Sequence, residues 1–245
     1  EEAAAQGMIA GINAACRVLN REPFFLTRDT SYIAVMVDDL VTLGVSEQYR
    51  MFTSRAEYRL QLREDNADVR LTPLARNLGL VDDEAWRNFN EHEARISREK
   101  SRFQRVSAKP TSETNEWLRS CGSAELLDSI RLEDLIRRSE LTYTEIARQF
   151  PGEPLTDREI KRLETELKFA GYLERQGEEV ERLKRMENVC IPDGFSYAAL
   201  KNLSIEVRER LETIRPRTLG QAARLSGVTP AAVRLLAVYL RKHDH

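Results

Sequence analysis

The sequence contains few of the residues on which catalytic, metal-binding or membrane-spanning proteins depend. Its 245 residues include three histidines, 7% aromatic residues and three widely spaced cysteines, Cys16, Cys121 and Cys190. Because the cysteines are odd in number and lack the spacing of metal ligands, we expect reduced thiols in a cytoplasmic protein. No apolar run approaches the roughly 20 residues that cross a bilayer, and no signal peptide is present, so we expect no membrane segment.

Sequence motifs for catalysis are absent as well. The chain has no G-x-G-x-x-G turn, no P-loop, no H-E-x-x-H and no recognisable Ser/His/Asp set. His92 lies in a charged helical pattern, and the other two histidines lie at the C-terminal end. Asp38 and Asp39 form a carboxylate pair without a third ligand nearby, so we expect surface capping or an arginine partner for them. The sequence therefore assigns no catalytic residue and predicts no metal site.

Charge is distributed unevenly along the chain. Apolar residues make up 41% and charged residues 32%, which is typical of a folded, helix-rich protein. The net charge is −2, yet residues 195–245 carry nine Lys and Arg against four Asp and Glu, and residues 116–194 carry thirteen against eighteen. Basic patches rather than net charge indicate nucleic-acid contact, and the acidic middle argues against a general nucleic-acid wrapper.

An arginine-rich segment is the most informative feature of the chain. Four arginines recur every four or five residues, with three aromatic residues among them: Arg50, Arg55, Arg59 and Arg63, with Tyr49, Phe52 and Tyr58. Glu57 is the only acidic residue between the first and the last arginine. Arginine binds phosphate through two parallel hydrogen bonds and stacks on bases, so this segment is the kind of surface that meets RNA.

Local signals predict how these arginines are presented. Ser54 and Glu57 fit a capping box, which predicts a helix that begins at about Arg55. On such a helix Arg55, Arg59 and Arg63 would share one face. The alternative from the residues alone is that these arginines pair with nearby carboxylates, such as Glu57, or with another domain.

Helical patterns cover most of the remaining sequence. They predict helices at residues 1–20, 83–105 and 156–187, and a pair of short helices at the C-terminal end. Gly7 and Gly11 lie four residues apart in the first helix and would allow close packing against a sheet. The polar segment 106–115 is expected to be a linker.

The two C-terminal helices raise the possibility of a helix-turn-helix DNA-binding module. Ala223, Gly227 and Val233 occupy the small, turn and core positions of that motif, and basic residues are near. However, the second helix would begin with Thr229 and Pro230 followed by two alanines, and proline and alanine cannot read base edges through bidentate hydrogen bonds. Contact with the RNA backbone or with a protein is favoured over sequence-specific DNA reading.

Several stretches resemble one known family. Residues 47–60, EQYRMFTSRAEYRL, are similar to E-P-Y-R-M-F-T-S-R-A-E-Y-R-L of the tRNA uridine 5-carboxymethylaminomethyl modification enzymes, the MnmG or GidA family, with Gln48 in place of proline. The opening EEAAAQGMIAGINA resembles the end of that family's Gly-rich flavin-domain motif. GYLERQGEEVERLKRME and LGQAARLSGVTPAAV resemble its C-terminal region. Because the chain starts without Met inside a helical pattern, we expect a fragment, and the resemblance implies that it is a C-terminal one.

The resemblance implies a fold class and a function. It implies the end of a flavin-binding α/β domain followed by a mainly α C-terminal domain with a small terminal helical bundle. We expect boundaries at 1–76, 77–150 and 151–245. The implied enzyme uses FAD and NADH, whose sites lie mainly upstream of this chain, and modifies C5 of the wobble uridine of tRNA with an aminomethyl or carboxymethylaminomethyl group. The implied form is a cytoplasmic homodimer that works with an MnmE-type GTPase.

The resemblance also implies roles for residues of this chain. Arg50, Arg55, Arg59 and Arg63 match the family motif and are expected to bind tRNA phosphate or to border the flavin cleft. The terminal helices are expected to contact the GTPase partner through a second set of residues: Arg224, Arg234 and Tyr239. We expect the fragment to be inactive by itself. A helix-turn-helix DNA-binding protein and a structural helical adaptor remain the alternative functions.

Overall fold

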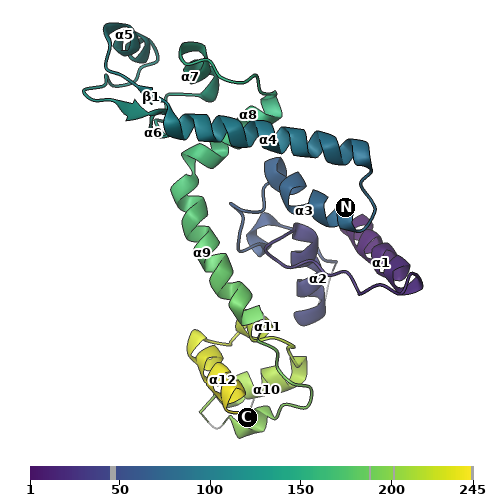
Figure 1. Cartoon of the computed structure of the whole chain (residues 1–245). Helices are drawn as coiled ribbons and strands as arrows, with labels where there is room; N and C mark the ends of the chain where they lie inside the picture. The colour runs from purple at the N-terminus through teal and green to yellow at the C-terminus, as the bar shows by residue number, and fades with distance from the viewer. Residues whose placement is uncertain (45–47, 188, 201, 244–245) are drawn as a thin grey trace. The chain divides into compact units, whose positions relative to one another are not determined.

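The computed structural model describes residues 1–44, 48–187, 189–200 and 202–243, and these residues are mainly helical (Figure 1). The chain forms two compact units. The continuous unit consists of residues 62–175. The discontinuous unit combines residues 1–61 with residues 176–245. The boundaries predicted from the sequence at residues 76 and 150 stay predictions. In the part of the chain that is described, no helix is long and apolar enough to cross a membrane.

The continuous unit is built around one long helix and several short elements. Its elements are η2 (Glu64–Asn66), α3 (Ala67–Asn77), α4 (Asp83–Arg105), β1 (Ser107–Ala108), α5 (Ser112–Ser120), β2 (Ile130–Arg131), α6 (Leu132–Leu135), α7 (Tyr143–Gln149) and α8 (Asp157–Lys168). The two strands pair antiparallel, with Ser107 opposite Arg131. The predicted helix at 83–105 is confirmed, and its first turn is capped by the Asp82 carboxylate, which accepts a hydrogen bond from the Ala85 amide.

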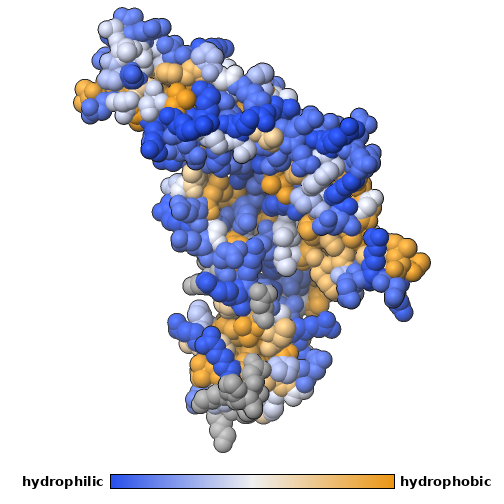
Figure 2. Space-filling view, in the orientation of Figure 1, coloured by the Kyte–Doolittle hydropathy of each residue, from blue (hydrophilic) through white to orange (hydrophobic). Residues whose placement is uncertain are grey.

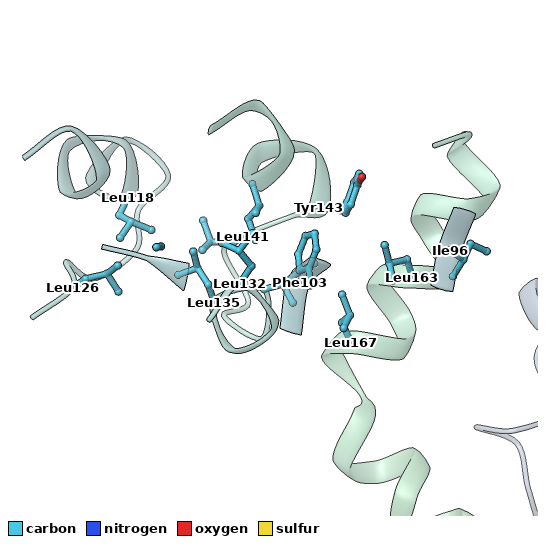
Figure 3. Packing of buried hydrophobic residues seen from close by; sticks show 13 residues of the cluster. Ile96, Phe103, Leu118, Leu126, Leu132, Leu135, Leu141, Tyr143, Leu163 and Leu167 are labelled. Carbon is cyan, nitrogen blue, oxygen red and sulfur yellow. The ribbon is translucent and has the colours of Figure 1, made fainter. Parts of the chain in front are cut away.

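An apolar core holds the continuous unit together (Figure 3). Phe103 on α4 is completely buried and stacks on Tyr143 of α7, with ring centroids 5.7 Å apart. Leucine and isoleucine side chains from the short helices fill the space around this pair: Leu118, Leu132, Leu135, Ile136, Leu141, Ile146 and Leu163. We name this cluster the apolar core. Burial of such side chains contributes about 1.5–3 kcal/mol each before the cost of ordering the chain.

Two expectations about the continuous unit are wrong. The segment 106–115 is not a linker, because it forms β1 and the start of α5, and Ala108 is fully buried in the apolar core. The predicted helix 156–187 is interrupted at Phe169, where φ is −103° and ψ is 13°. It therefore forms α8 and α9 (Ala170–Glu187) as separate helices. The periodicity of the sequence continues through this break, so it gave no signal of it.

The discontinuous unit contains both ends of the chain. Its N-terminal part holds α1 (Glu2–Val18), α2 (Tyr32–Thr42) and η1 (Thr53–Arg55), and its C-terminal part holds the end of α9, η3 (Tyr197–Ala199), α10 (Ile205–Ile214), α11 (Leu219–Arg224) and α12 (Pro230–His243). A second apolar cluster centres on Tyr197, Leu211 and Leu236. The small helical bundle predicted at the C-terminal end is thereby confirmed.

The short terminal helices begin and end where local signals predicted. The Thr218 hydroxyl accepts a hydrogen bond from the Gln221 amide at the start of α11. Gly227 has φ +85°, a left-handed conformation that glycine adopts at little cost, and it separates α11 from α12. Pro230 occupies the first turn of α12, where its missing amide proton costs no hydrogen bond.

The first helix is more exposed than the sequence suggested. Of the residues in α1, Cys16 alone is buried, and Met8 is about half exposed. A Cβ atom placed on Gly7 or Gly11 would meet no described atom within 4 Å, so neither glycine packs closely against another backbone in this chain. Figure 2 shows apolar side chains at the surface over α1.

Candidate functional site

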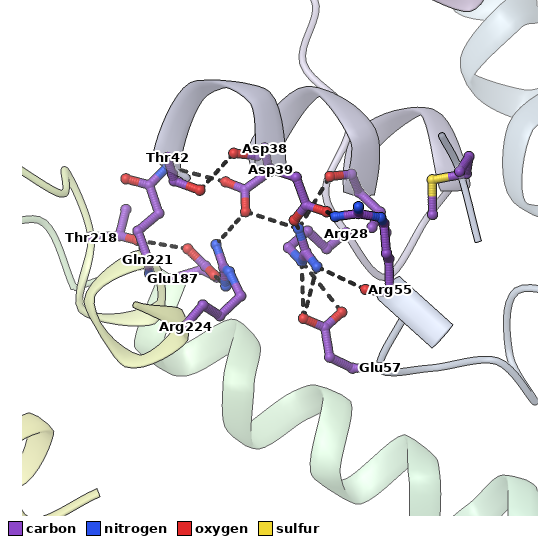
Figure 4. A network of polar contacts seen from close by, with 12 residues as sticks. Arg28, Asp38, Asp39, Thr42, Arg55, Glu57, Glu187, Thr218, Gln221 and Arg224 are labelled. Atoms are coloured by element: carbon purple, nitrogen blue, oxygen red, sulfur yellow. Dashed lines mark hydrogen bonds and ion pairs between the residues drawn. The ribbon is translucent and has the colours of Figure 1, made fainter. Parts of the chain in front are cut away.

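A buried arginine organises the N-terminal part of the discontinuous unit (Figure 4). Only 10% of the Arg28 side chain is exposed. Its Nη1 donates hydrogen bonds to Asp38 at 3.1 Å and to Asp39 at 2.6 Å, and its Nη2 donates to Glu57 at 2.9 Å. Burial alone would lower the pKa of Arg28, but the hydrogen bonds to Glu57 and Asp39 raise it above its usual value. Arg28 is therefore a permanent cation held by three carboxylates.

Arg28 also binds two backbone carbonyl groups. Its Nη1 donates to the carbonyl oxygen of Val35 in α2, and its Nη2 donates to the carbonyl oxygen of Arg55 at the end of η1, each at 3.2 Å. The second contact is made by the backbone of a predicted tRNA-binding residue. One guanidinium group thus connects α2 to the arginine-rich segment.

Asp39 and Tyr49 extend this arrangement toward Arg55. The Tyr49 hydroxyl donates a hydrogen bond of 2.8 Å to Asp39. Burial, together with this hydrogen bond to a carboxylate, raises the pKa of Tyr49 above its usual value, so the phenol stays protonated. The guanidinium carbon of Arg55 lies 4.5 Å from the centroid of the Tyr49 ring, and its Nη1 lies 3.8 Å from the Asp39 carboxylate. These contacts orient Arg55 without burying it.

The predicted helix through the arginine-rich segment is wrong. Residues 53–55 form only the short η1, Ala56 has an extended conformation, and turns follow. The Ser54 side chain does not cap a helix, because Glu57 turns toward Arg28 instead of back toward the Ser54 amide. The tertiary contact between Glu57 and Arg28 takes the place of the local capping hydrogen bond.

Three of the four predicted tRNA-binding arginines lie in the discontinuous unit. Arg50, Arg55 and Arg59 are all exposed. The Nε of Arg50 is 3.4 Å from Glu2, whose carboxylate also accepts a hydrogen bond from the Met51 amide. Arg59 has no ion-pair partner among the residues that the structure describes. The segment therefore presents exposed guanidinium groups on loops rather than on one helix face.

Arg63, the fourth predicted arginine, belongs to the continuous unit. It is mostly buried, and its Nε donates a hydrogen bond of 2.8 Å to Asp65. Its carbonyl oxygen accepts a hydrogen bond from Arg70. Arg63 therefore pairs with a neighbouring carboxylate, which is the alternative that the sequence left open.

The network continues from Asp38 to the C-terminal helices. The Asp38 carboxylate accepts from Arg224 at 2.9 Å and from Gln221 at 3.3 Å, both on α11. Arg224 also pairs with Glu187 at the end of α9, and the Thr218 hydroxyl donates to that same carboxylate at 2.6 Å. We call the whole set the polar network, and its members are Arg28, Asp38, Asp39, Tyr49, Arg55, Glu57, Glu187, Thr218, Gln221 and Arg224.

The three residues predicted to contact a partner protein lie in different surroundings. Arg224 is mostly buried in the polar network. Tyr239 is partly buried and packs against the apolar cluster of the terminal bundle. Arg234 is exposed on α12. Only Arg234 is therefore presented to solvent in the way that a partner contact requires.

A cavity of about 620 Å³ adjoins the polar network within the discontinuous unit. Its charged lining residues are Asp29, Asp38, Glu57, Glu187, Arg28, Lys184 and Arg224. The four carboxylates outnumber the three cations, and every cation among them is paired with a carboxylate. Such a lining does not attract phosphate groups, so the exposed arginines outside it are the better candidates for contact with a polyanion.

Comparisons with known proteins decide the family. The description "tRNA modifying enzyme MnmG/GidA C-terminal helical domain" matches residues 83–177, and "tRNA modifying enzyme MnmG/GidA C-terminal helical bundle" matches residues 179–245. The chain belongs to the MnmG/GidA family. The resemblance found in the sequence is thus confirmed, and so is the mainly helical fold class.

Named relatives agree with this assignment. The chain is 48% identical over 243 residues to the tRNA uridine 5-carboxymethylaminomethyl modification enzyme MnmG of Geobacillus thermodenitrificans and 47% identical to that of Geobacillus kaustophilus. The match covers 99% of this chain but 39% of each of those relatives. Two solved structures of Aquifex aeolicus GidA are 40% identical, with TM-scores of 0.78 and 0.76, and the match covers 98% of this chain and 37% of each of theirs.

Sequence reasoning missed the residue at the centre of the polar network. Arg28 stands alone in a loop between α1 and α2, and nothing in its local pattern points to a role. The available signal was the carboxylate pair Asp38–Asp39, for which an arginine partner was expected. That expectation is confirmed, because Asp38 pairs with Arg28 and with Arg224. Arg28 lies 10 residues before Asp38 in the sequence, and Arg224 lies 186 residues after it.

In this MnmG/GidA chain, His92 and Glu159 have structural partners. His92 lies 2.7 Å from Glu159, which also accepts from Arg95 at 2.9 Å and completes the capping box of α8. Within the described residues, no group of three or more His, Cys, Asp and Glu side chains is arranged to hold a metal ion. No described histidine is placed next to a nucleophile.

Proposed function

We propose that this chain supplies tRNA and partner contacts to an enzyme that modifies C5 of the wobble uridine. Family membership and the names of the relatives support the activity, which the full-length relatives carry over more than twice the length of this chain. The observation that carries the role of this chain is the exposed set Arg50, Arg55 and Arg59, of which Arg59 has no ion-pair partner among the described residues. Exposed guanidinium groups attract phosphate.

The first experiment tests the arginine contacts. Arg55→Ala and Arg59→Ala, made at the full length of the protein that carries this chain, should each weaken tRNA binding. The slope of log affinity against log salt should fall by roughly 0.9 per lost duplex contact or 0.7 per lost single-strand contact. Arg210→Ala removes an exposed arginine from α10 and is the matched control. Unchanged affinity and salt slope for both site variants would refute the proposed contacts.

The cofactor FAD, which the family implies, does not fit the residues of this chain alone. The chain lacks a Gly-rich phosphate turn, and the 620 Å³ cavity carries an excess of carboxylates that disfavours a diphosphate. We infer that FAD and NADH are bound mainly by residues outside this chain. The isolated 245-residue chain mixed with FAD should give no spectrum of bound flavin, whereas a stoichiometric yellow protein would contradict the inference.

We propose Arg234 as the centre of a contact with a GTPase partner of the MnmE type. Arg224 is held in the polar network and Tyr239 packs on the bundle core, so these two residues are less available to a partner than Arg234. Arg234→Glu should abolish capture of the partner in a pull-down, whereas Arg241→Glu, an exposed arginine of the same helix, is the control. We further infer a cytoplasmic homodimer, and light scattering of the full-length protein checks the dimer.

The start of α12 favours tRNA over sequence-specific DNA as the nucleic acid. Ala232 and Val233, in the first turn of this helix, are buried in the bundle core. Their small apolar side chains are therefore not available to contact base edges. Competition between tRNA and random duplex DNA at fixed salt tests this preference. Equal affinity for both would favour the DNA-binding alternative, and no nucleic-acid binding with retained partner capture would favour a structural adaptor.

A further inference from the structure

We propose that Arg28 is a positioning residue that keeps the arginine-rich segment available for phosphate. It does so by holding the carboxylates of Asp39 and Glu57 and the backbone of Arg55 in fixed places. The proposal rests on the proposed function, because it concerns the same tRNA contacts. It adds a residue that belongs to neither predicted site.

The first line of argument is the direction of the Glu57 side chain. Glu57 lies two residues from both Arg55 and Arg59 and is the only acid among residues 50–63. An unengaged carboxylate at that position would pair with one of these guanidinium groups or repel an approaching phosphate. Both oxygens of Glu57 instead lie within 3.3 Å of Arg28, which directs the negative charge inward (Figure 4).

The second line of argument is the backbone. Arg28 donates to the carbonyl oxygen of Arg55, and the residues after η1 form turns rather than a helix or a strand. A loop of this kind adopts many conformations unless tertiary contacts restrict it. The contact therefore limits where the guanidinium group of Arg55 can point, together with its packing over the Tyr49 ring.

Arg28 does not itself contact a ligand. Its side chain is 10% exposed, and its three guanidinium nitrogens are all engaged by Asp38, Asp39, Glu57 or backbone oxygens. An effect of its substitution on tRNA affinity would have to pass through the residues that it holds. This separates it from Arg55 and Arg59, which are exposed.

A double-mutant cycle on the full-length protein tests the charge argument. Arg28→Gln should weaken tRNA binding about tenfold, which corresponds to about 1.4 kcal/mol. Glu57→Gln alone should leave the affinity for tRNA unchanged or slightly improve it, because Arg28 still binds the carboxylates of Asp38 and Asp39. The double variant R28Q/E57Q should recover most of the lost affinity, since the released carboxylate is then absent. A purely structural role of Arg28 would give no such recovery.

Controls and outcomes separate this proposal from the tRNA contact itself. Arg162→Gln is the matched control, because Arg162 is equally buried and also pairs with two carboxylates but lies in the continuous unit. Hydrogen exchange of α2 shows whether R28Q remains folded. If R55A weakens binding but R28Q does not, or if the double variant stays as weak as R28Q, the positioning role is wrong. If R55A has no effect, the proposed tRNA contact is wrong.

Discussion

The apolar core of the continuous unit and the polar network of the discontinuous unit show two ways of holding a polypeptide in one conformation. In the apolar core, Phe103, Leu132 and Ile146 are fully buried, and their contacts have no preferred direction. In the polar network, each contact of Arg28 has a defined donor and acceptor. Apolar burial supplies most of the stability of a fold, whereas an ionic cluster costs desolvation and mainly selects one arrangement. The network therefore suits the orientation of exposed groups.

The largest expected effect comes from breaking the apolar core. Phe103→Ala should lower the free energy of unfolding of the continuous unit by about 3–5 kcal/mol, since it removes a large buried ring and leaves a cavity. Urea unfolding followed by tryptophan fluorescence measures it, because Trp86 and Trp117 both lie in this unit. Leu127→Ala, at a residue of the same unit that is 92% exposed, is the control and should change stability by less than about 0.5 kcal/mol. If Phe103→Ala and its control lowered the free energy of unfolding equally, apolar burial would not be what stabilises this unit.

A smaller effect is expected from the polar network. Asp39→Asn keeps the shape of the side chain but removes the charge that Arg28 and Tyr49 share, and it should cost about 1–3 kcal/mol. Hydrogen exchange of the α2 amides measures the local loss. Asp134→Asn removes an exposed carboxylate paired with Arg137 and should cost almost nothing. A loss as large as that of Phe103→Ala would mean that the network, too, carries the stability of its unit.

Acid should weaken the continuous unit through Glu159. Burial alone would raise the pKa of Glu159, but hydrogen bonds from the Thr156 backbone and the contact with His92 lower it from 4.5 to about 2. A lowered pKa in the folded state means that the stabilisation is fully present above pH 4.5 and is lost as the pH falls to about 2. After solvent screening we expect about 1–2 kcal/mol.

The matched variant for this prediction is Glu159→Gln. It should be less stable than the original protein at neutral pH, and the difference should shrink as the pH falls from 4.5 to about 2. Tryptophan fluorescence in urea at several pH values measures the difference. A difference that is independent of pH would show that Glu159 contributes through packing rather than through its charge.

The smallest expected effect compares one local motif in the two units. Thr142 caps α7 and Thr218 caps α11, each through its hydroxyl oxygen. Thr142→Ala should cost about 1 kcal/mol. Thr218→Ala should cost somewhat more, because its hydroxyl donates to Glu187, which also pairs with Arg224, whereas the Thr142 hydroxyl donates to Glu145 within its own capping box. Thermal unfolding with hydrogen exchange measures both, and Thr144→Ala, at an exposed position without a capping role, is the control. Equal losses would show that the bond to Glu187 contributes nothing.

Local signals predicted the elements whose causes are local. The helix Asp83–Arg105 appears where its sequence pattern placed it, and the capping boxes at Thr142 and Thr156 likewise depend only on residues within one turn. The proposed helix from Arg55 failed for the opposite reason. Its capping residue Glu57 found a stronger, buried cationic partner 29 residues away. The strand at Ser107–Ala108 was missed because two residues carry no periodicity.

The sequence by itself determined the family, the helical class and the position of the arginine-rich segment, because these follow from composition, periodicity and a matching motif. The tertiary structure decided which of those arginines are available and which are paired. Arg63 binds Asp65, while Arg28 binds Glu57, the one acidic residue between Arg50 and Arg63 in the sequence. The physical reason is that the strength of an ion pair depends on burial and on distance in space, and residue spacing along the chain reports neither.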